Sequence, residues 1–128
     1  MTDTPADGAR FVLKGTAPSR AMRYGRGTAE QLVDEKLGAT QVDFHVNTIL
    51  AGSRPGPYHL HNDVENVYYV LHGRLLIRTE DGEREIGPGD AVFFPRGVAH
   101  SATNVGPDDA RIIEIYAPCG PDFVELED

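Results

Sequence analysis

Three of the five histidines in this chain have the spacing of metal ligands. His59 and His61 are separated by one residue, and His100 lies much later in the sequence. Side chains at positions i and i+2 of a β-strand point to the same side, with Cα atoms about 7 Å apart, so two imidazoles can reach one ion. Three converging imidazoles are typical of a divalent transition-metal site. A His-x-His pair by itself more often belongs to a polar surface or a hydrogen-bonded core, so the metal interpretation depends on His100 reaching the same point.

The elements that must position these histidines are short strands. Alternating or short apolar runs, separated by Gly, Pro and Asp turns, recur about every ten residues, which is typical of an antiparallel sandwich or barrel. The predicted strands cover residues 41–50, 67–71, 75–79, 84–86, 91–94, 100–105 and 111–116. The predicted fold class is therefore all-β, with one core in a chain of 128 residues.

One strand of this set has a strong alternation of apolar and polar residues. One face of residues 41–50 holds Val42, Phe44 and Val46, and the other holds Asp43, His45 and Asn47. We expect the apolar face to join the core, together with Phe93, Phe94, Val70, Ile77 and Ile113. The polar face could pass beside the histidines, but a solvated or edge-strand position is the simpler interpretation.

The N-terminal part has weaker signals. Residues 1–10 are polar and are interpreted as a loose tail, and residues 10–14 are a possible edge strand. We expect an arm over residues 1–27, partly flexible, followed by a single domain over residues 28–128.

One short helix is predicted at the start of that domain. Thr28 and Gln31 fit a capping box, in which each side chain accepts a hydrogen bond from the backbone N–H of the other residue. Leu32 and Leu37 belong to a weak apolar stripe, and Gly38 suits a helix stop. No other helix is expected.

The charge is unevenly distributed. The chain carries a net charge of −8; residues 1–27 hold five basic and two acidic side chains, so this head is +3 and residues 28–128 carry −11. The acidic body argues against a nucleic-acid partner. The basic head could bind an anion, although a solvated arm, or a strand against the acidic body or a partner subunit, is the simpler interpretation.

The expected location is the cytoplasm. Cys119 is the only cysteine, so no internal disulfide can form, which suits a reducing compartment. The N-terminus does not have the basic and apolar pattern of a secretory signal. No apolar run approaches the length of a membrane span, so no membrane partner is expected.

A block later in the chain resembles a motif of the cupin superfamily. That motif is Gly, five residues, Pro, one residue, Gly, two residues, His, three residues, Asn, and it is matched by Gly89, Pro95, Gly97, His100 and Asn104. Residues 53–73 resemble the family's first motif through His59, His61 and Gly73, with Ser53 in place of the leading Gly. The resemblance covers about residues 40–117. It implies an antiparallel jelly roll, the double-stranded β-helix, with the three histidines in a divalent metal site.

The fourth ligand of that family's site falls at an ambiguous position. Counting forward from His61 leads to Glu65, whereas counting back from Gly73 leads to Asn66. One position on a strand means the opposite face. Regular geometry turns Asn66 inward, and a β-bulge could turn Glu65 inward instead. We favour Asn66 as the ligand, with Glu65 as the alternative. A site of neutral ligands would leave the ion its full charge and favour an anionic ligand.

Three further residues are candidates for the cavity wall. Tyr68 would share the inward face with Asn66, where it could orient a substrate or only fill the barrel. Glu114 and Tyr116 alternate on the last strand and could serve as general acid or base, but an outward Glu114 is as good an interpretation. Imidazole ligation suits Zn, Mn, Fe, Ni or Co, and the sequence does not choose among them.

The resemblance implies a metalloenzyme acting on a small anionic organic molecule, such as a dioxygenase, an isomerase or a decarboxylase. One alternative is a non-catalytic cupin that binds or senses a small ligand. Another is a metal-free sugar isomerase or epimerase, in which His61 and Tyr68 would act as base and acid. A homodimer is expected, since residues 11–13 could pair as an edge strand between subunits.

Overall fold

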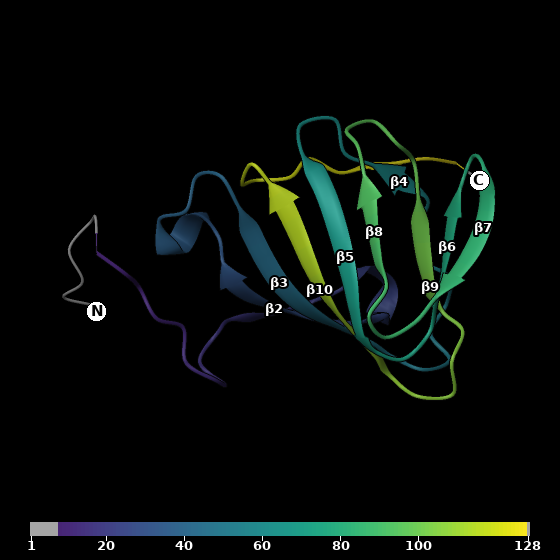
Figure 1. The fold of residues 1–128 in the computed structure, drawn as a ribbon, viewed down its shortest axis with the longest axis horizontal. Coiled ribbons are helices and arrows are strands. Elements are labelled where there is room, and N and C mark those ends of the chain that lie inside the picture. The colour runs from purple at the N-terminus through teal and green to yellow at the C-terminus, as the bar shows by residue number, and fades with distance from the viewer. Residues whose placement is uncertain (1–7, 128) are drawn as a thin grey trace.

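The computed structural model describes residues 8–127, which form eleven strands and two turns of 3-10 helix (Figure 1). The strands are β1 Ser19–Ala21, β2 Gly27–Val33, β3 Asp43–Ile49, β4 His59–Leu60, β5 Glu65–His72, β6 Leu75–Thr79, β7 Gly82–Ile86, β8 Ala91–Phe94, β9 Ser101–Asn104, β10 Ala110–Ala117 and β11 Val124–Glu125. The 3-10 turns are η1 Arg23–Gly25 and η2 Glu35–Leu37.

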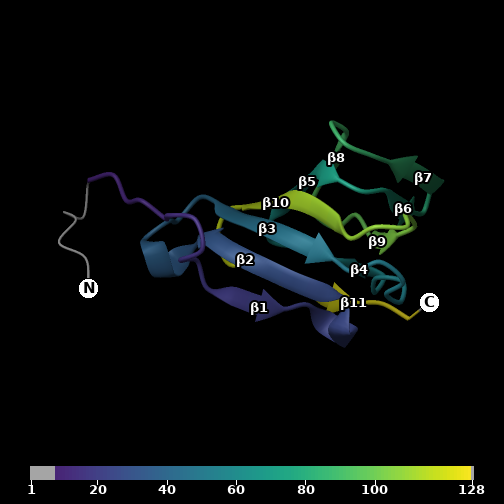
Figure 2. The ribbon, with the colours of Figure 1, turned by 90° about the horizontal axis from the view of Figure 1, so that it is seen from below.

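These strands form three antiparallel sheets. The largest has six strands in the order β1-β2-β3-β10-β5-β8, a second has the order β7-β6-β9, and β11 pairs with β4. In Figure 1 the six-stranded sheet runs from β2 at the left to β8 near the centre, and the three-stranded sheet lies at the right; Figure 2 shows the fold from below. The predicted all-β antiparallel fold is confirmed. Across residues 8–127 no helix is long and apolar enough to cross a membrane.

The apolar core occupies the half of the fold where the large and the three-stranded sheets face each other. Its buried members are Ile49, Tyr68, Val70, Leu75, Ile77, Ile86, Phe94, Ala102, Ala110 and Ile112. Each large aliphatic side chain buried in this way contributes about 1.5–3 kcal/mol relative to exposure. This core holds the strands in register and leaves the other half of the inner surface free for polar groups.

Two residues of the family motifs have structural roles in this half. Gly73 has a φ of +92°, and a Cβ there would lie 2.7 Å from Ala110 Cα, so the turn requires glycine. Asn104 donates from Nδ2 to the carbonyl oxygens of Ile49 (2.9 Å) and Asp108 (3.0 Å) and accepts from the Gly106 amide. The amide of Asn104 therefore ties the end of β9 to the end of β3 and to the turn before β10.

The helix predicted from Thr28 to Gly38 is wrong. Most of this segment is β2, which pairs with β1 on one side and β3 on the other. Only η2 is helical, where the Asp34 carboxylate accepts the Lys36 amide and Gly38 ends the turn in the left-handed region. The capping-box pattern is a local signal, and strand pairing on both edges outweighs it.

The edge strand predicted over residues 10–14 is also not formed. The first strand is β1, and Ala21 pairs with Thr28 across the expected boundary between arm and domain. The domain division at residue 28 stays a prediction. Of the predicted loose tail, residues 1–7 lie outside the described residues.

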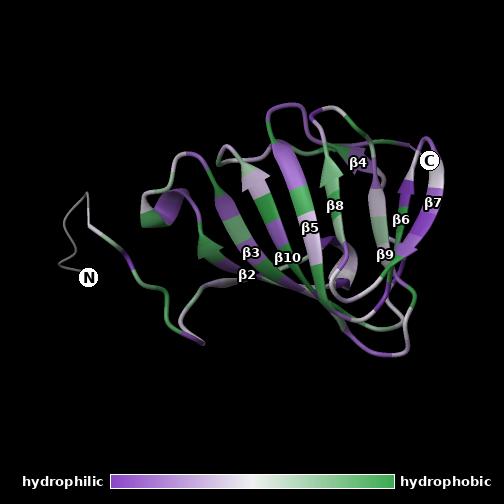
Figure 3. Ribbon diagram, in the orientation of Figure 1, coloured by the Kyte–Doolittle hydropathy of each residue, from purple (hydrophilic) through white to green (hydrophobic). Residues whose placement is uncertain are grey.

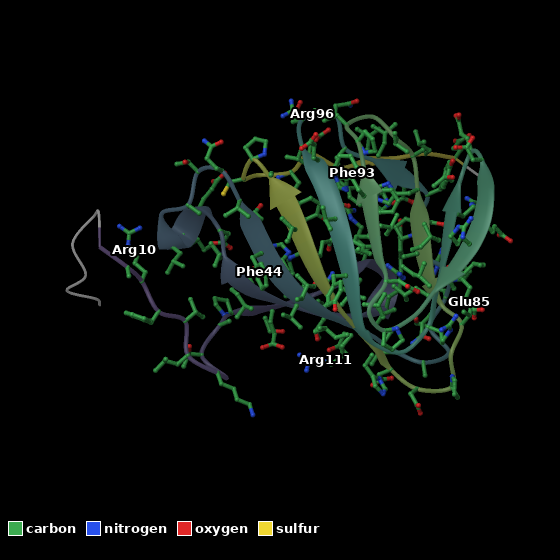
Figure 4. All side chains as sticks on the ribbon, viewed as in Figure 1. Arg10, Phe44, Glu85, Phe93, Arg96 and Arg111 are labelled. Carbon is green, nitrogen blue, oxygen red and sulfur yellow. The ribbon has the colours of Figure 1, made fainter. Side chains whose placement is uncertain are left out.

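The facing predicted for β3 is reversed. Asp43, His45 and Asn47 are each 4% exposed, whereas Phe44 is only half-buried. Figure 3 shows the alternating bands along β3 and β5. Phe93, labelled with Phe44 in Figure 4, is 53% exposed, so its predicted core position is wrong as well. Alternation identifies two faces but does not say which is inward, and here the polar face of β3 lines a cavity.

Candidate metal centre and its cavity

A cavity of about 370 Å³ lies against the inner face of the six-stranded sheet. Residues of β2, β3 and β10 line it, together with residues of β4 and of the segment 121–123. Cavities of about 300–1,000 Å³ are typical of small-molecule sites. The volume therefore suits a ligand of modest size.

The three predicted histidines lie close together, and two of them, His59 and His61, line this cavity. His59 and His100 face each other across an antiparallel bridge, with backbone N–H···O distances of 3.0 Å and 2.8 Å. His61 follows two residues after His59 and lies on the same side. All three are buried, and one ligand nitrogen from each lies within 4.8 Å of the others. The backbone bridge thus joins the two motifs, and the three histidines could hold a metal ion.

Backbone carbonyl groups orient all three imidazoles in the same way. Nδ1 of His59 donates to Pro57 O (2.8 Å), Nδ1 of His100 donates to Val98 O (2.9 Å), and Nδ1 of His61 makes a short hydrogen bond to Asp122 O. Because a carbonyl oxygen only accepts, each Nδ1 carries the proton and each Nε2 keeps a free lone pair.

Two of these lone pairs are free of other partners. Nε2 of His61 and of His100 is buried and makes no hydrogen bond within residues 8–127. Two buried acceptors without a hydrogen-bond partner lower the stability of the fold unless a ligand binds them. The donor set, three neutral imidazole nitrogens, fits a divalent transition metal.

Burial also keeps two of these imidazoles, those of His59 and His100, neutral. Burial lowers the pKa of His59, and it lowers that of His100 from 6.5 to about 3, with a further decrease from the neighbouring imidazoles. A neutral imidazole is the form that binds metal.

The C-terminal segment completes this end of the cavity, and the sequence did not predict its role. The Asp122 carboxylate accepts the backbone N–H groups of Asn62 (2.8 Å) and Asp63 (2.9 Å). The Phe123 ring stacks on His59, with centroids 4.5 Å apart, and the Arg23 guanidinium lies 4.0 Å from the Phe123 centroid on the ring face. An Asp-Phe pair after the last predicted strand has no motif that would identify it.

Asn66 and Glu65 lie on opposite faces of β5. Asn66 is 1% exposed and Glu65 is exposed. Nδ2 of Asn66 donates to Glu114 Oε2 (3.2 Å) and to Ile115 O (3.0 Å), while its Oδ1 is buried with no partner in residues 8–127. The free oxygen of Asn66 is therefore a possible metal ligand, and the Glu65 side chain points away from the inner face.

A second polar group lies on the sheet side of the cavity. Its members are Asp43, His45 and Asn47 of β3 and Glu114 and Tyr116 of β10, all of them at most 8% exposed. Asn47 donates to Glu114 (2.7 Å). The solvated position expected for His45 and Asn47 is thus wrong, and an outward Glu114 is excluded. Asp43 was not singled out from the sequence, although its place two residues before His45 puts it on the same face.

The two tyrosines of the cavity are held as neutral hydroxyl groups. Burial raises the pKa of Tyr68 and of Tyr116 well above 10, and the negative charge of Glu114 raises both further. Both side chains are therefore hydrogen-bond donors at neutral pH. Tyr68 is buried on the inner face beside Glu114, as expected from its alternation with Asn66.

Three arginines from the N-terminal segment also line the cavity: Arg20, Arg23 and Arg26. Arg26 is 6% exposed, donates from Nη2 to Ala102 O (2.7 Å), and has a buried Nε without a partner in the described residues. Burial lowers its pKa, and the nearby Tyr68 and Glu114 oppose that decrease. Part of the basic head is thus part of the cavity wall.

Comparisons with known proteins agree with this architecture. The model of the cupin domain family matches residues 46–116. The chain is 29% identical over 118 residues to the tetracenomycin polyketide synthase protein TcmJ of Streptomyces glaucescens, covering 92% of this chain and 77% of that protein.

Two solved structures share the fold. One is the polyketide cyclase RemF of Streptomyces resistomycificus, with a TM-score of 0.80, 24% identity and coverage of 94% of this chain and 87% of that one. The other is a sugar phosphate isomerase of Silicibacter pomeroyi, with a TM-score of 0.73, 16% identity and coverage of 91% and 92%. At these identities the structures show the fold alone. The family match, which spans both histidine motifs, shows that the chain belongs to the cupin family.

Proposed function

We propose that this protein is a divalent-metal-dependent enzyme acting on a small organic molecule, with His59, His61 and His100 as the metal ligands. One observation carries the proposal: three buried imidazoles each have a ring nitrogen within 4.8 Å of the others, and a backbone carbonyl holds the Nδ1 of each. Surface or core histidines have no need of such an arrangement. When bound, the ion would supply a Lewis acid that polarises a carbonyl or carboxylate oxygen.

Asn66 is proposed as a fourth ligand. Its inward position and its unpartnered Oδ1 support this role, and the exposure of Glu65 argues against the alternative. The metal is Zn, Mn, Fe, Ni or Co, since imidazole nitrogens suit all of these ions.

An anionic or strongly polar substrate is favoured by the cavity wall. Arg20, Arg23 and Arg26 come from one short segment and line the cavity together with the carboxylates of β3 and β10. With a divalent ion and neutral ligands beside them, these cations would attract carboxylate, phenolate or enolate oxygens.

Among reaction classes, ring closure of a polycarbonyl compound has the best support. RemF is described as a polyketide cyclase, and TcmJ as a polyketide synthase protein. Such a reaction needs a Lewis acid and proton transfer but no oxidant, so it suits a cavity that holds both a candidate metal site and buried acid–base groups. We therefore favour a cyclase over the dioxygenase that the sequence suggested.

A homodimer remains part of the proposal. Phe11 and Leu13 are 83% and 67% exposed, and the segment holding them is not paired in the described structure. Exposed apolar residues of this kind favour association. Sedimentation velocity at micromolar concentration would test the dimer. A cytoplasmic location also stays a prediction.

The metal assignment can be tested by elemental analysis of the purified protein. We expect about one transition-metal ion per chain in the wild type and in His72→Ala, whose histidine is exposed and outside the cavity. His59→Ala and His100→Ala should each lose most of the metal, because each removes one of three ligands. Unchanged metal content in both variants would refute this ligand set.

A further inference from the structure

The polar group on the sheet side of the cavity has no part in the proposed metal ligation. His45 and Glu114 are 4% and 6% exposed and line the same cavity as His59 and His61. Placing an imidazole and a carboxylate in a protein interior lowers stability unless they are compensated. Ionisable groups that are kept in a cavity in this way are candidates for a functional role.

Glu114 is held in a single orientation by two amides. Nδ2 of Asn47 donates to its Oε1 (2.7 Å), and Nδ2 of Asn66 donates to its Oε2 (3.2 Å). Both carboxylate oxygens thus accept hydrogen bonds from uncharged donors. These donors do not neutralise the negative charge of Glu114, which therefore still acts on the neighbouring side chains of the sheet.

His45 is the neighbour best placed to use that charge. It lies directly opposite Glu114 in the register of β3 and β10, where Cβ atoms are about 4.5–5.5 Å apart. Its Nδ1 is buried and has no hydrogen-bond partner in residues 8–127. Burial lowers the pKa of His45, while the charges of Glu114 and Asp43 oppose the decrease. The imidazole is therefore neutral near pH 7 and has a ring nitrogen available to accept a proton.

The Tyr116 side chain lies near both His45 and the candidate metal-binding end, which we define as His59, His61 and His100. The Tyr116 ring lies 5.8 Å from the His45 ring and 5.1 Å from the His61 ring, in an edge-on arrangement with each. A substrate that fills the cavity can thus contact both ends at once.

We propose that His45 is the general base of this enzyme, that Glu114 positions it and balances its charge, and that the substrate is a ketone with acidic hydrogens on the carbon next to the carbonyl. This inference rests on the proposed metal-dependent function, because the ion supplies the carbonyl polarisation that makes those hydrogens acidic.

The proton transfer balances without any further reactant. His45 removes the proton from the carbon beside the carbonyl: the C–H bond breaks, an N–H bond forms on the imidazole, and the electron pair becomes the C=C bond of an enolate. The enolate carbon then attacks a second carbonyl carbon of the same molecule. A C–C bond forms, the second carbonyl oxygen becomes an alkoxide, and the imidazolium returns its proton to that oxygen.

The first half of this sequence can be measured with a model ketone. The probe is 2′-hydroxyacetophenone in D₂O, and the readout is loss of the methyl signal in proton NMR as deuterium replaces hydrogen. Wild-type protein, as purified, should accelerate this exchange. His45→Gln should reduce the acceleration by about 100-fold or more, which is typical for loss of a general base. His72→Gln, the same substitution at an exposed histidine of β5, should leave it unchanged.

Glu114→Gln provides a second variant that keeps the side-chain shape. As a positioning residue, Glu114 should affect the maximal rate and not the probe concentration at half-saturation. We expect about a tenfold lower maximal exchange rate, with unchanged half-saturation. An equal change in both kinetic parameters would show a merely structural role.

The outcomes separate this inference from the proposed function. If His45→Gln retains wild-type exchange while His59→Ala loses both metal and exchange, the base assignment is wrong and the metal function stands. If chelation leaves exchange intact but His45→Gln abolishes it, the metal function is wrong and the base stands. A wild-type protein that exchanges no faster than buffer would overturn the proposal, as would full activity in both His45→Gln and Glu114→Gln.

Discussion

The two ends of the cavity are built in different ways. At the candidate metal-binding end, the imidazoles of His59, His61 and His100 are oriented by backbone carbonyl groups of Pro57, Val98 and Asp122. At the sheet end, strand register places His45 opposite Glu114, and side-chain amides hold Glu114. Backbone contacts fix a side chain more firmly than side-chain contacts do, so the first end suits an ion that must stay in place. The second keeps an unpartnered ring nitrogen, which suits a group that must gain and lose a proton.

Metal removal should produce the largest difference between the two ends. If the ion is bound about a thousandfold above its dissociation constant, chelation should cost about 4 kcal/mol of unfolding free energy. For a domain of this size that corresponds to a decrease in Tm of about 10–15 °C. Calorimetry with and without a chelator measures it. The decrease should persist in His45→Gln and vanish in His100→Ala, and its persistence in His100→Ala would contradict the assignment of the ends.

Lowering the pH should destabilise the metal-free protein through histidines at both ends of the cavity. The pKa of His45, of His59 and of His100 is lowered in the folded state, chiefly by burial. The unfolded chain therefore binds more protons than the folded one below about pH 6.5, and stability falls as pH falls. Each histidine contributes up to about 1.4 kcal/mol per pH unit, and for His100 the loss continues down to about pH 3.

Urea unfolding in chelator at pH 5.5 and pH 7.5 measures this dependence. The wild type should lose on the order of 2–4 kcal/mol over that interval. His100→Gln should lose less, because one lowered pKa is gone, whereas His72→Gln should match the wild type. Equal stability of the wild type at the two pH values would show that these imidazoles do not have lowered pKa values.

The sequence predicted the grouping of the three histidines because its determinants are local. Gly97 turns the chain just before His100, His-x-His needs only a strand to align its side chains, and Gly73 marks a turn that no other residue fits. The spacing of these residues along the chain therefore predicts how the three histidines are arranged. The inward position of Asn66 followed from the same reasoning, by counting alternate residues along β5.

The sheet end could not be predicted in the same way. The alternation of Asp43, His45 and Asn47 with apolar residues identifies two faces, but a cavity reverses the usual rule that the apolar face is inward. Similarly, β2 has a weak helical pattern and becomes a strand because β1 and β3 both pair with it. Asp122 meets the metal-binding end only through the fold of the whole chain.

The C-terminal segment offers a more selective way to perturb the metal-binding end. Asp122→Ala removes the acceptor of the Asn62 and Asp63 amides, and the shift of this segment should misorient His61, which donates to the Asp122 carbonyl. We expect about a tenfold weaker metal affinity, as is typical when groups that orient a ligand are lost. Competition with a chromophoric chelator measures it, and Glu127→Ala, an exposed carboxylate five residues later, is the control. Unchanged affinity in Asp122→Ala would mean that strand β4 orients His61 alone.

Tyr116→Phe should have the smallest effect, and it tests whether the two ends act separately. The substitution keeps the ring that lies between His45 and His61 and removes only the hydroxyl, which hydrogen-bonds to Glu114. Loss of one such bond should cost about 0.5–1.5 kcal/mol. Because no metal ligand changes, the metal affinity should stay within about threefold of the wild type. The Glu114 carboxylate keeps its two amide donors, so it still balances the charge on His45. A large loss of metal affinity would show instead that the hydroxyl couples the ends, and His45 would then be part of the metal-binding network.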